Sequence, residues 1–508
     1  MGCRVSFVHV LILGLLWFLQ PQLAIGSALV QTFTVDCGVR CQTMDNFGAN
    51  DAWTMQNIGG WPEPVKSHVA DLLFSTNNGI GLSCWRFYCA AGINHRTIQD
   101  SWRTDESFAL EPGRYDWSRE AGERWFLRAA KARGVRQFIA TFYSPPPWLT
   151  RNGLSNLGDD THSTTNLKPG AEEAYAHYIT DILVHFRDDP DERERIEFDY
   201  VVPANEPQWD WQDAQEGNRA SNEDLRRIYV ALAGCLRQAG LKTKILGPES
   251  GCLPDMTSLD AGAVAKWHAD YGDYLHLICG DPAVSDGFGG VVSYHSYWSD
   301  RIPDRLEPER RRLGQAMQNH PGWKIWQSEY CIMEAGRDLT MDMALRVALI
   351  INSDLTLANA SAWQWWLAVA NEDFKSGLIY TDYRNPGDSE DILESKTLWV
   401  LGNFSKFIRP GMVRVQLSGR QNATKLVASA FTDINSGRTV LVFVNSSSQP
   451  QPVKIQFRSS AGKTIWLTPY TTSAQDNLAK SGKIPATESF SILPRSVVTL
   501  LGEGTSTK

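Results

Sequence analysis

The chain has 508 residues and a formal net charge of −8, from 49 Lys and Arg against 57 Asp and Glu. This length exceeds one ordinary hydrophobic core and suits one large domain with a smaller one. The charges are spread without long runs of one sign, so we expect neither nucleic acid nor an anionic membrane surface as a partner. The 19 Trp residues are well above ordinary usage. Indole rings stack on the apolar faces of sugars, although they also fill large cores.

The N-terminus begins with a short apolar segment. Arg4 precedes the apolar run from Val5 to Leu19, and the small-residue pattern Ala24-Ile25-Gly26 follows it. This order is typical of a signal peptide, which we place at 1–26. Because the run is only slightly shorter than the roughly 20 apolar residues of a spanning helix, a retained N-terminal anchor is the alternative. We expect a secreted protein, or a periplasmic one in a bacterium, that leaves the membrane after signal removal and is a monomer.

Eight cysteines lie outside the signal segment, and an even number permits disulfides in an exported protein. Proximity in sequence makes Cys37/Cys41, Cys84/Cys89 and Cys252/Cys279 plausible pairs, although the connectivity cannot be deduced and some thiols can stay free. The chain has neither a doubled Cys-x-x-Cys motif nor a His pair at ligand spacing. We therefore expect no zinc site.

From about Gln42 to Phe407, short β-rich runs alternate with amphipathic helical stretches such as Ala171–Phe186 and Glu223–Ala239. This alternation indicates a parallel sheet with helices outside it. Eight units predict an α/β fold, a closed (β/α)₈ TIM barrel over 44–408. The expected strands are Thr43–Ala49, Gly81–Phe87, Arg136–Phe142, Glu197–Pro203, Thr243–Leu246, Gly289–Tyr294, Lys324–Ser328 and Ala360–Trp366.

The pattern changes after Pro410-Gly411, where helical periodicity stops. Alternating, β-branched runs follow, separated by Ser-, Gly- and Asn-rich turns, and they predict an antiparallel β-sandwich over 409–508. These runs are Met412–Leu417, Leu426–Phe431, Thr439–Asn445, Val453–Phe457 and Ser496–Leu501. The N-terminal segment 27–43 contains a further β-rich run, Thr32–Asp36, which we expect to pair with the sandwich.

The strongest local signal is Asn205-Glu206-Pro207, at the end of the fourth predicted strand. Side chains at the C-terminal ends of barrel strands are rigidly held and face the cleft, which is where such barrels carry out chemistry. Pro207 cannot donate to a sheet ladder and therefore ends the strand at the carboxylate. The structural alternative is that Glu206 only caps the next helix.

A second carboxylate, Glu329, ends the seventh predicted strand. Strands four and seven of an eight-stranded barrel lie nearly opposite each other, so Glu206 and Glu329 can face one cleft. A pair of carboxyl groups about 5–5.5 Å apart is the arrangement that cleaves glycosidic bonds with retention of configuration, and we predict this spacing. Glu334 is a rival nucleophile, but it lies beyond the strand end in a predicted loop.

In these and further motifs, the chain resembles glycoside hydrolase family 30 over nearly all of its mature length. The resemblance rests on Asp45–Trp53, Gly81–Phe87, Ser144–Trp148, Asn205–Pro207, His295–Tyr297, Ser328-Glu329, Trp363–Trp366 and Leu401–Gly411. It implies a (β/α)₈ barrel fused to a β-sandwich, with Glu206 as acid/base and Glu329 as nucleophile. Two carboxylates perform this chemistry without a metal or cofactor, so we expect neither.

The resemblance also implies supporting residues around the two carboxylates. Asn205 would bond the sugar 2-hydroxyl, and Tyr297 would hydrogen-bond Glu329. Arg86 would lie beneath Glu329 and lower its pKa, while His295 would line the cleft floor. Asp51 and Trp53 would end the −1 pocket, and its aromatic walls would be Trp148 and Trp365 or Trp366. For each of these the alternative is plain barrel packing, above all for Trp53, Trp363 and His295.

The substrate is the least determined property. Tyr88 stands where many family members have Asn, which changes the cleft floor. The sequence of the first strand and Trp61-Pro62 resemble the endo-β-1,6-galactanase-like members. A β-1,6-galactan is therefore the preferred polysaccharide, with β-1,6-glucan and (glucurono)xylan as alternatives. Lys375 and Arg384 would read a uronate carboxylate if they face the cleft, and are otherwise solvated. A hypothesis of another class is an inactive carbohydrate-binding homologue.

Overall fold

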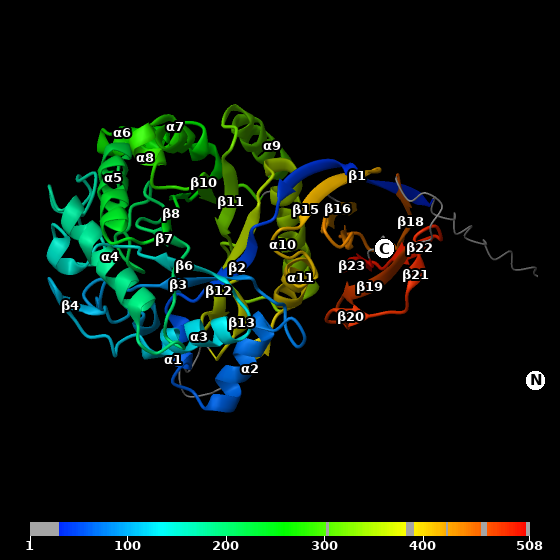
Figure 1. The fold of residues 1–508 in the computed structure, drawn as a ribbon, viewed down its shortest axis with the longest axis horizontal. Helices are drawn as coiled ribbons and strands as arrows, with labels where there is room; N and C mark the ends of the chain where they lie inside the picture. The colour runs from blue at the N-terminus through cyan, green and yellow to red at the C-terminus, as the bar shows by residue number, and fades with distance from the viewer. Residues whose placement is uncertain (1–29, 301–303, 383–390, 423–424, 459–464, 504–508) are drawn as a thin grey trace, which may run out of the picture.

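The computed structural model describes residues 30–300, 304–382, 391–422, 425–458 and 465–503. The predicted signal peptide and Arg384 lie outside these residues. The described chain forms a barrel surrounded by helices and, beside it, a β-sheet domain (Figure 1). None of the helices in the described part of the chain has both the length and the apolarity that crossing a membrane requires.

All eight predicted barrel strands are present, in parallel order around one sheet. They are β2 Asn46–Asn50, β3 Cys84–Tyr88, β6 Gln137–Thr141, β7 Tyr200–Val202, the pair β8 Lys244–Ile245 and β9 Pro248–Ser250, β10 Val291–His295, β11 Lys324–Glu329 and β12 Ala362–Ala370. The fifth strand is divided in two: β8 pairs with β7, and β9 pairs with β10, so this strand closes the barrel. The predicted (β/α)₈ barrel is therefore confirmed.

Helices cover the outside of the barrel in the predicted alternation (Figure 1). They are α1 Thr54–Ile58, α2 Glu63–Phe74, α3 Ala121–Ala132, α4 Glu172–Asp188, α5 Asn222–Gln238, α6 Ala261–Trp267, α7 Tyr274–Gly280, α8 Pro282–Ser285, α9 Leu306–Ala316, α10 Met341–Ser353 and α11 Lys396–Ser405. The start of α5 shows why the sequence is helical there. Ser221 accepts a hydrogen bond from the Asp224 backbone, and the Asp224 carboxylate accepts one from the Ser221 backbone, forming a capping box. The short strands β4 Ala109–Glu111, β5 Arg114–Tyr115, β13 Gly377–Tyr380 and β14 Leu393–Glu394 lie in the connecting loops.

Alternation along each strand decides which residues reach the inside of the barrel. On β3, Trp85 and Phe87 point outward, and their rings contact Phe74 of α2 and Phe186 of α4. The inward residues form an apolar layer of Cys84, Ile139, Val202, Leu246, Val291, Trp326 and Ala362. The next inward position on β3 is Arg86. The apolar layer thus supports a buried polar layer at the C-terminal end of the barrel.

The C-terminal domain is built from antiparallel strands as predicted. They are β15 Val413–Ser418, β16 Leu426–Thr432, β17 Thr439–Asn445, β18 Gln451–Phe457, β19 Trp466–Thr472, β20 Ala479–Lys480, β21 Ile484–Pro485, β22 Phe490–Ile492 and β23 Ser496–Gly502. The N-terminal strand β1, Gln31–Thr43, joins them, antiparallel to β15 and parallel to β18. Since Thr43 pairs with Val413, the first barrel strand begins only at Asn46, later than the sequence predicts.

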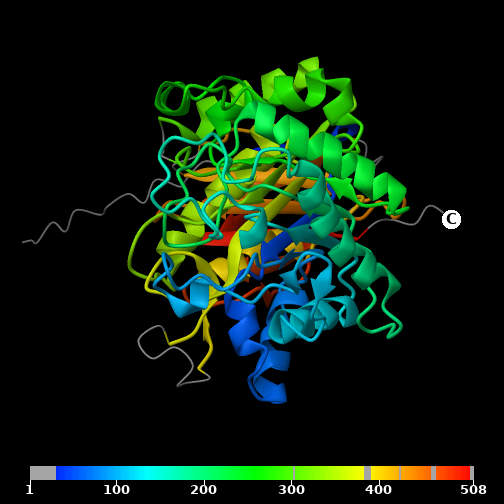
Figure 2. The same cartoon turned by 90° about the vertical axis from the view of Figure 1, so that its left-hand side faces the viewer.

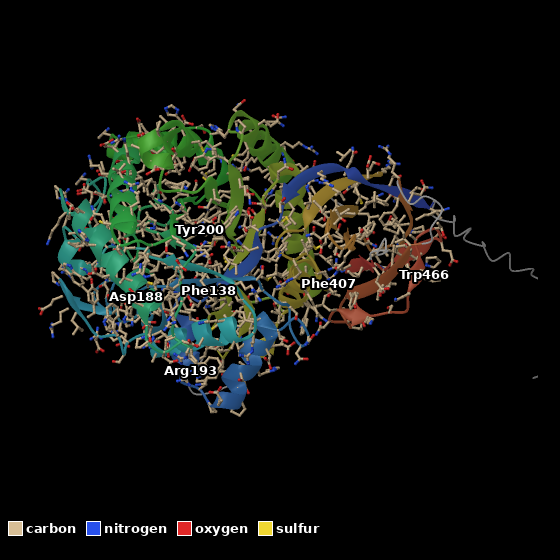
Figure 3. All side chains as sticks on the ribbon, in the orientation of Figure 1. Phe138, Asp188, Arg193, Tyr200, Phe407 and Trp466 are labelled. Carbon is tan, nitrogen blue, oxygen red and sulfur yellow. The ribbon has the colours of Figure 1, made fainter. Side chains whose placement is uncertain are left out.

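The sheet domain lies against helices of the barrel, behind the barrel in the view of Figure 2. Phe407 follows α11 at the junction, and its ring centroid is 4.6 Å from that of Tyr470 on β19 (Figure 3). The Asn403 amide donates to the Thr499 hydroxyl across 3.0 Å. Trp466, by contrast, is exposed on the far side of the domain (Figure 3). The two parts of the described chain therefore share an interface that includes buried polar bonds.

The structure corrects the suggested disulfides, because all eight cysteines from Cys37 to Cys331 are free thiols. Cys84 belongs to the inner layer of the barrel, whereas Cys89 follows the end of the same strand. Residues an odd number of positions apart on a strand point to opposite faces, so these two thiols face apart. Cys252 instead donates a hydrogen bond to Asp255 across 3.0 Å.

Candidate active site

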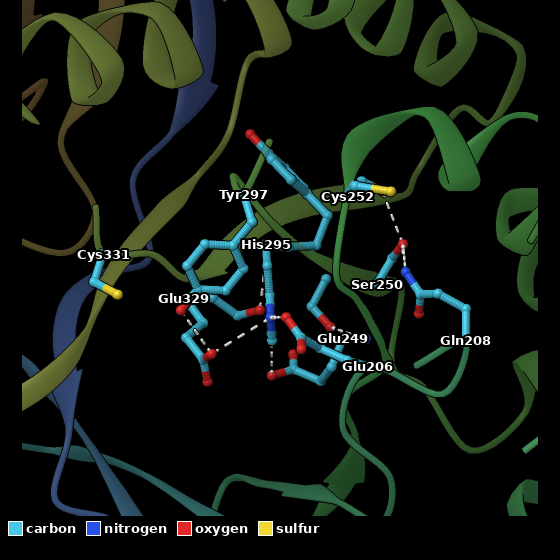
Figure 4. A network of polar contacts seen from close by, with 12 residues as sticks. Glu206, Gln208, Glu249, Ser250, Cys252, His295, Tyr297, Glu329 and Cys331 are labelled. Atoms are coloured by element: carbon cyan, nitrogen blue, oxygen red, sulfur yellow. Dashed lines mark hydrogen bonds and ion pairs between the residues drawn. The ribbon is translucent and has the colours of Figure 1, made fainter. Parts of the chain in front are cut away.

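Glu206 and Glu329 lie together at the C-terminal end of the barrel (Figure 4). Glu329 is the last residue of β11, and Glu206 follows the end of β7. Glu206 has a φ of +42°, in the left-handed region, and its backbone N–H donates to the carbonyl of Glu249 across 3.0 Å. One carboxylate oxygen of each residue and a ring nitrogen of His295 all lie within 4.8 Å of one another. The structure thus brings both predicted carboxylates to one place, although they are far apart in the sequence.

His295 lies between the two carboxylates, inside the barrel and fully buried. Its Nδ1 is 2.8 Å from Glu206 Oε1 and 3.6 Å from Glu329 Oε1, and its Nε2 is 3.2 Å from Glu249 Oε2. Burial disfavours the charged ring, but the charges of Glu329 and Glu206 and the hydrogen bonds with Glu206 and Glu249 outweigh it and raise the pKa of His295 to about 10. The imidazole is therefore protonated at neutral pH, and both ring nitrogens donate.

Glu249 is a buried carboxylate that the sequence reasoning missed. Its Oε2 accepts a hydrogen bond of 2.6 Å from Arg86, and both side chains are fully shielded from solvent. Burial alone would raise the pKa of Glu249, but the charge of Arg86 and the bond with His295 hold it below its usual range. A signal for it existed in the sequence, because Glu249 follows the fifth predicted strand much as Glu206 follows the fourth.

Arg86 has a different partner from the one the resemblance implies. Its guanidinium binds Glu249 and donates to the backbone carbonyl of Ser328 across 2.5 Å, with no hydrogen bond to Glu329 among the described residues. The next residue after Ser328 is Glu329, so Arg86 still acts on this carboxylate through space. Its positive charge is one of the influences that lower the pKa of Glu329.

The surroundings of Glu329 change the pKa of its carboxyl group in opposite directions. Burial is the largest influence and the negative charge of Glu206 adds to it, while His295 and Arg86 oppose them, and the result raises the pKa of Glu329 to about 7. The phenol of Tyr297 donates to Glu329 Oε1 across 2.9 Å, as expected from the sequence. Asn205 is buried beside Glu206, and within the described residues its side-chain oxygen has no hydrogen-bond partner. This oxygen can accept a bond from a bound ligand.

A group of aromatic side chains comes from β3 and β12 and from the segments that follow β2 and β6. Trp366 contacts Trp53 edge-on at 5.3 Å and Tyr143 at 6.0 Å between ring centroids, and Tyr88 lies 5.2 Å from Tyr143. Tyr88, the residue that departs from the family pattern, is thus one member of this wall. The structure separates the two Trp candidates of β12. Trp365 points outward, where its Nε1 donates to the Ser376 carbonyl across 2.6 Å.

The other two predicted residues, Trp148 and Asp51, contact the protein as follows. Trp148 packs edge-on against Tyr178 of α4, at 5.9 Å between centroids. It lines a separate cavity of about 350 Å³ with Glu106, Arg119 and other residues of the loop after β3. Asp51 is fully buried, and its Oδ1 accepts a hydrogen bond of 2.7 Å from the Tyr88 backbone. Asp51 therefore supports the end of β3 rather than facing open space.

A cluster of buried carboxyl groups lies behind the aromatic wall, and we refer to it as the acidic cluster. It consists of Asp51, Asp105, Glu120, Glu123 and Glu216, all shielded from solvent. Burial is the largest cause that raises the pKa of each of them, to about 8 for Asp105 and for Glu216. Both carboxyl oxygens of Glu123 lack a hydrogen-bond partner among the described residues. Asp105 and Glu216 therefore keep their protons at neutral pH, because burial disfavours their ionised forms.

Glu334, the alternative nucleophile, and Lys375, the residue considered for uronate binding, form an ion pair with each other at the surface. Glu334 forms ion pairs with Lys375 at 2.5 Å and with Arg346 at 2.9 Å, and its side chain is 45% exposed. These charges compensate one another outside the buried centre. Lys375 accordingly has a protein carboxylate as its partner.

Glu206, His295 and Glu329 are also the one group among the described residues whose atoms could converge on a metal ion. A histidine ligand must be deprotonated, whereas the three neighbouring carboxylates keep His295 charged. The 2.8 Å contact between Nδ1 and Glu206 is a hydrogen-bond distance. We therefore treat these residues as an acid–base centre and not as metal ligands.

Comparison with known proteins agrees with this architecture. Residues 30–380 match O-Glycosyl hydrolase family 30, and residues 411–500 match the Glycosyl hydrolase family 30 beta sandwich domain. A conserved exported protein from Bacteroides fragilis is similar over 92% of this chain and 100% of its own, with 30% identity and a TM-score of 0.84.

Two solved structures, of a xylanase and of a glucanase, share the fold at lower identity. The catalytic domain of a xylanase C from Talaromyces cellulolyticus is 21% identical, with a TM-score of 0.69 over 93% of this chain and 99% of its own. An endo-β1,6-glucanase is 18% identical, with a TM-score of 0.68 over 93% of this chain and 94% of its own. Together with the two-domain match and the carboxylate pair, these findings show that the chain belongs to glycoside hydrolase family 30.

Proposed function

We propose that this glycoside hydrolase of family 30 is an exported, endo-acting enzyme that cleaves a β-linked polysaccharide with retention of configuration. The observation that carries the proposal is the approach of Glu206 and Glu329 oxygens to within 4.8 Å, with His295 between them. An inverting enzyme needs carboxyl groups roughly 6.5–9.5 Å apart to admit a water molecule. The short approach supports direct attack by one of the two carboxylates.

In the first step, Glu329 attacks the anomeric carbon while Glu206 gives its proton to the departing glycosidic oxygen. The bond between Glu329 and the sugar forms as the glycosidic bond breaks, and Glu206 becomes a carboxylate. In the second step, Glu206 removes a proton from water, the water oxygen bonds to the anomeric carbon, and Glu329 leaves as a carboxylate. Tyr297 supports Glu329 as an anion, since its phenol donates to the carboxylate.

Several other predicted residues have supporting roles in this proposal. The unpaired side-chain oxygen of Asn205 would accept a hydrogen bond from the sugar 2-hydroxyl. Trp366, Trp53 and Tyr143 would contact the sugar on the opposite side, because apolar faces of sugars stack on aromatic rings. Trp148, which packs against Tyr178, would contribute a further aromatic surface for the sugar.

The preferred substrate is a β-1,6-galactan side chain of the arabinogalactan type. Support comes from the resemblance of the first strand and of Trp61-Pro62 to galactanase-like members. Tyr88, which packs against Tyr143, departs from the pattern of many family members and leaves the substrate contacts on that side open. β-1,6-Glucan and (glucurono)xylan are the alternatives, since two structural relatives are an endo-β1,6-glucanase and a xylanase. The pairing of Lys375 with Glu334 gives no support to uronate recognition by this lysine.

A reducing-sugar assay on galactan, arabinogalactan, pustulan and xylan tests the function, with Glu329→Gln as the inactive control. We expect release from one polymer by the unaltered enzyme and a loss of several orders of magnitude in the variant. Proton NMR of the first-formed product is expected to show the β anomer. Binding of a polymer without cleavage would support the inactive carbohydrate-binding homologue, and an α anomer would exclude Glu329 as a covalent nucleophile.

Export and a monomeric state complete the proposal. The match to an exported protein from Bacteroides fragilis over nearly the whole chain supports export. Mass analysis of the secreted protein would test both points, since cleavage near residue 26 removes the predicted signal peptide. Size-exclusion chromatography with light scattering is expected to give one chain per particle.

A further inference from the structure

Three charged side chains, Arg86, Glu249 and His295, form a continuous buried chain that leads to Glu206. Arg86 contacts Glu249 at 2.6 Å. Glu249 contacts His295 at 3.2 Å, and His295 contacts Glu206 at 2.8 Å (Figure 4). Arg86, Glu249 and His295 are completely shielded from solvent. They come from β3, β9 and β10, which are separate segments of the barrel. Bulk solvent therefore cannot screen their charges, and the charges must largely balance one another.

A count of these charges shows what Glu249 changes. Arg86 and His295 carry two positive charges, and Glu249 carries one negative charge that balances one of them. One positive charge then remains for Glu206 and Glu329 together. The buried group is neutral when one of these two carboxyls is ionised and the other keeps its proton. Before the first step, this state has Glu329 as the nucleophile and Glu206 as the acid. Before the second step, Glu329 is an uncharged ester and Glu206 is the single carboxylate, so the group is again neutral.

Glu249 also fixes the direction of the remaining donor. Because Nε2 of His295 is bound to Glu249, the ring presents Nδ1 to the gap between Glu206 at 2.8 Å and Glu329 at 3.6 Å. The backbone carbonyl of Glu249 also accepts the Glu206 N–H across 3.0 Å. Both Glu206 and Glu249 have left-handed backbone conformations, with φ of +42° and +56°. The two contacts with Glu249 therefore fix the positions of His295 and Glu206 relative to each other.

We propose that Glu249 is a positioning residue that binds Arg86 and His295 and leaves a single cationic donor, the Nδ1–H of His295, for Glu206 and Glu329 to share. This donor stabilises whichever of the two carboxyls is ionised. When Glu329 is bonded to the sugar and has lost its charge, Nδ1–H supports Glu206 as the base. When the intermediate has been hydrolysed, the same donor faces the regenerated carboxylate of Glu329. The inference rests on the proposed function, because it assigns a role within that reaction.

The groups that face this chain come from every element packed around it. Glu206, Glu329 and Tyr297 face His295 from the loop after β7, from β11 and from the loop after β10. Arg86, Ser293 and Tyr229 face Glu249 from β3, β10 and α5. Tyr143 faces Arg86 from the loop after β6. Of these groups, Arg86 carries the only positive charge besides His295, so removal of the Glu249 charge leaves two cations against the single negative charge that Glu206 and Glu329 share.

The test is Glu249→Gln, which keeps the size of the side chain and removes its charge. Selective ¹⁵N-histidine labelling would follow the His295 ring by NMR, with the signal assigned by its loss in His295→Gln. We expect the ring to remain charged through pH 8 in the unaltered protein and to lose its proton at least one pH unit lower in Glu249→Gln. Hydrolysis is then compared for a polymer and for a 2,4-dinitrophenyl glycoside, whose leaving group needs no proton. We expect the variant to lose at least tenfold more kcat/KM on the polymer than on the dinitrophenyl substrate.

Tyr294→Phe provides a matched control, because Tyr294 precedes His295 but points outward to bond Asp354. We expect this variant to keep the His295 titration and the ratio of the two activities. An unchanged titration in Glu249→Gln overturns the proposal, as does an equal loss on both substrates. A protein that cleaves no glycoside would refute the proposed function instead, and the histidine titration would still decide whether Glu249 sets the charge of His295.

Discussion

The phenol of Tyr297 donates a hydrogen bond across 2.9 Å to Oε1 of Glu329, the same oxygen that lies 3.6 Å from Nδ1 of His295. The bond favours the ionised nucleophile, in opposition to the burial that raises the pKa of Glu329 to about 7. We expect Tyr297→Phe to lower kcat by about 10- to 100-fold, the usual worth of a hydrogen bond to a charged group. Because the pKa of Glu329 rises further, the acid limb of the pH–rate profile should move to higher pH. An unchanged acid limb would contradict this role of the phenol.

The two carboxylates should respond differently to replacement and to added azide. In Glu206→Ala, a dinitrophenyl glycoside still forms the intermediate on Glu329, and azide should release it as the β-glycosyl azide. In Glu329→Ala, azide should displace the leaving group directly and give the α-glycosyl azide. NMR of the two products checks the assignment. The opposite pair of anomers would exchange the roles of the two residues.

Trp366 and Trp365 are neighbours in sequence that face opposite sides of β12. Trp366→Phe shortens a wall of the proposed sugar pocket, and we expect kcat/KM to fall by about tenfold or more through weaker contact with the substrate. Trp365→Phe removes the hydrogen bond to Ser376, which should lower the free energy of unfolding by about 1–2 kcal/mol with kcat/KM nearly unchanged. Kinetics and urea unfolding of both variants measure the difference. A larger fall in kcat/KM for Trp365→Phe than for Trp366→Phe would mean that Trp365, and not Trp366, faces the substrate.

The acidic cluster makes stability depend on pH. Asp105 and Glu216 have pKa values of about 8 in the folded protein and about 4 when unfolded, so the folded state binds more protons between these limits. Their contribution is complete below pH 4 and is lost as the pH rises towards 8. We expect the Tm to be lower at pH 8 than at pH 5 by roughly 5 °C or more. Asp105→Asn with Glu216→Gln should flatten this decline, and a slope equal to that of the unaltered protein would argue against the cluster as its source.

Glu334 provides a test of the nucleophile that is independent of the buried centre. Its carboxylate is bound to Lys375 and Arg346 in an exposed loop, where ion pairs contribute little to stability. Glu334→Gln should therefore keep kcat/KM within about twofold of the unaltered enzyme, since exposed substitutions away from a site have small effects. A loss as large as that of Glu329→Gln would restore Glu334 as the rival nucleophile.

Much of the fold could be predicted because it depends on local patterns. Apolar runs at regular spacing marked the eight barrel strands, and the change to alternating β-branched residues after Gly411 marked the sheet domain. The shift in the first barrel strand had a nonlocal cause. Thr43 is β-forming on its own, but it pairs with Val413 in the other domain, so the strand begins three residues later.

The sequence by itself determined which carboxylates end strands, since Glu206 and Glu329 each follow a recognisable strand run. It could not determine which buried side chains meet inside the barrel, because β3, β9 and β10 are brought together only by barrel closure. That closure gave Arg86 the partner Glu249 in place of Glu329 and put His295 between two carboxylates. It also decided that Trp366 faces inward, because strand register fixes which alternate residues point into the barrel. Charges far apart along the chain acquire their partners, and therefore their protons, only from the tertiary structure.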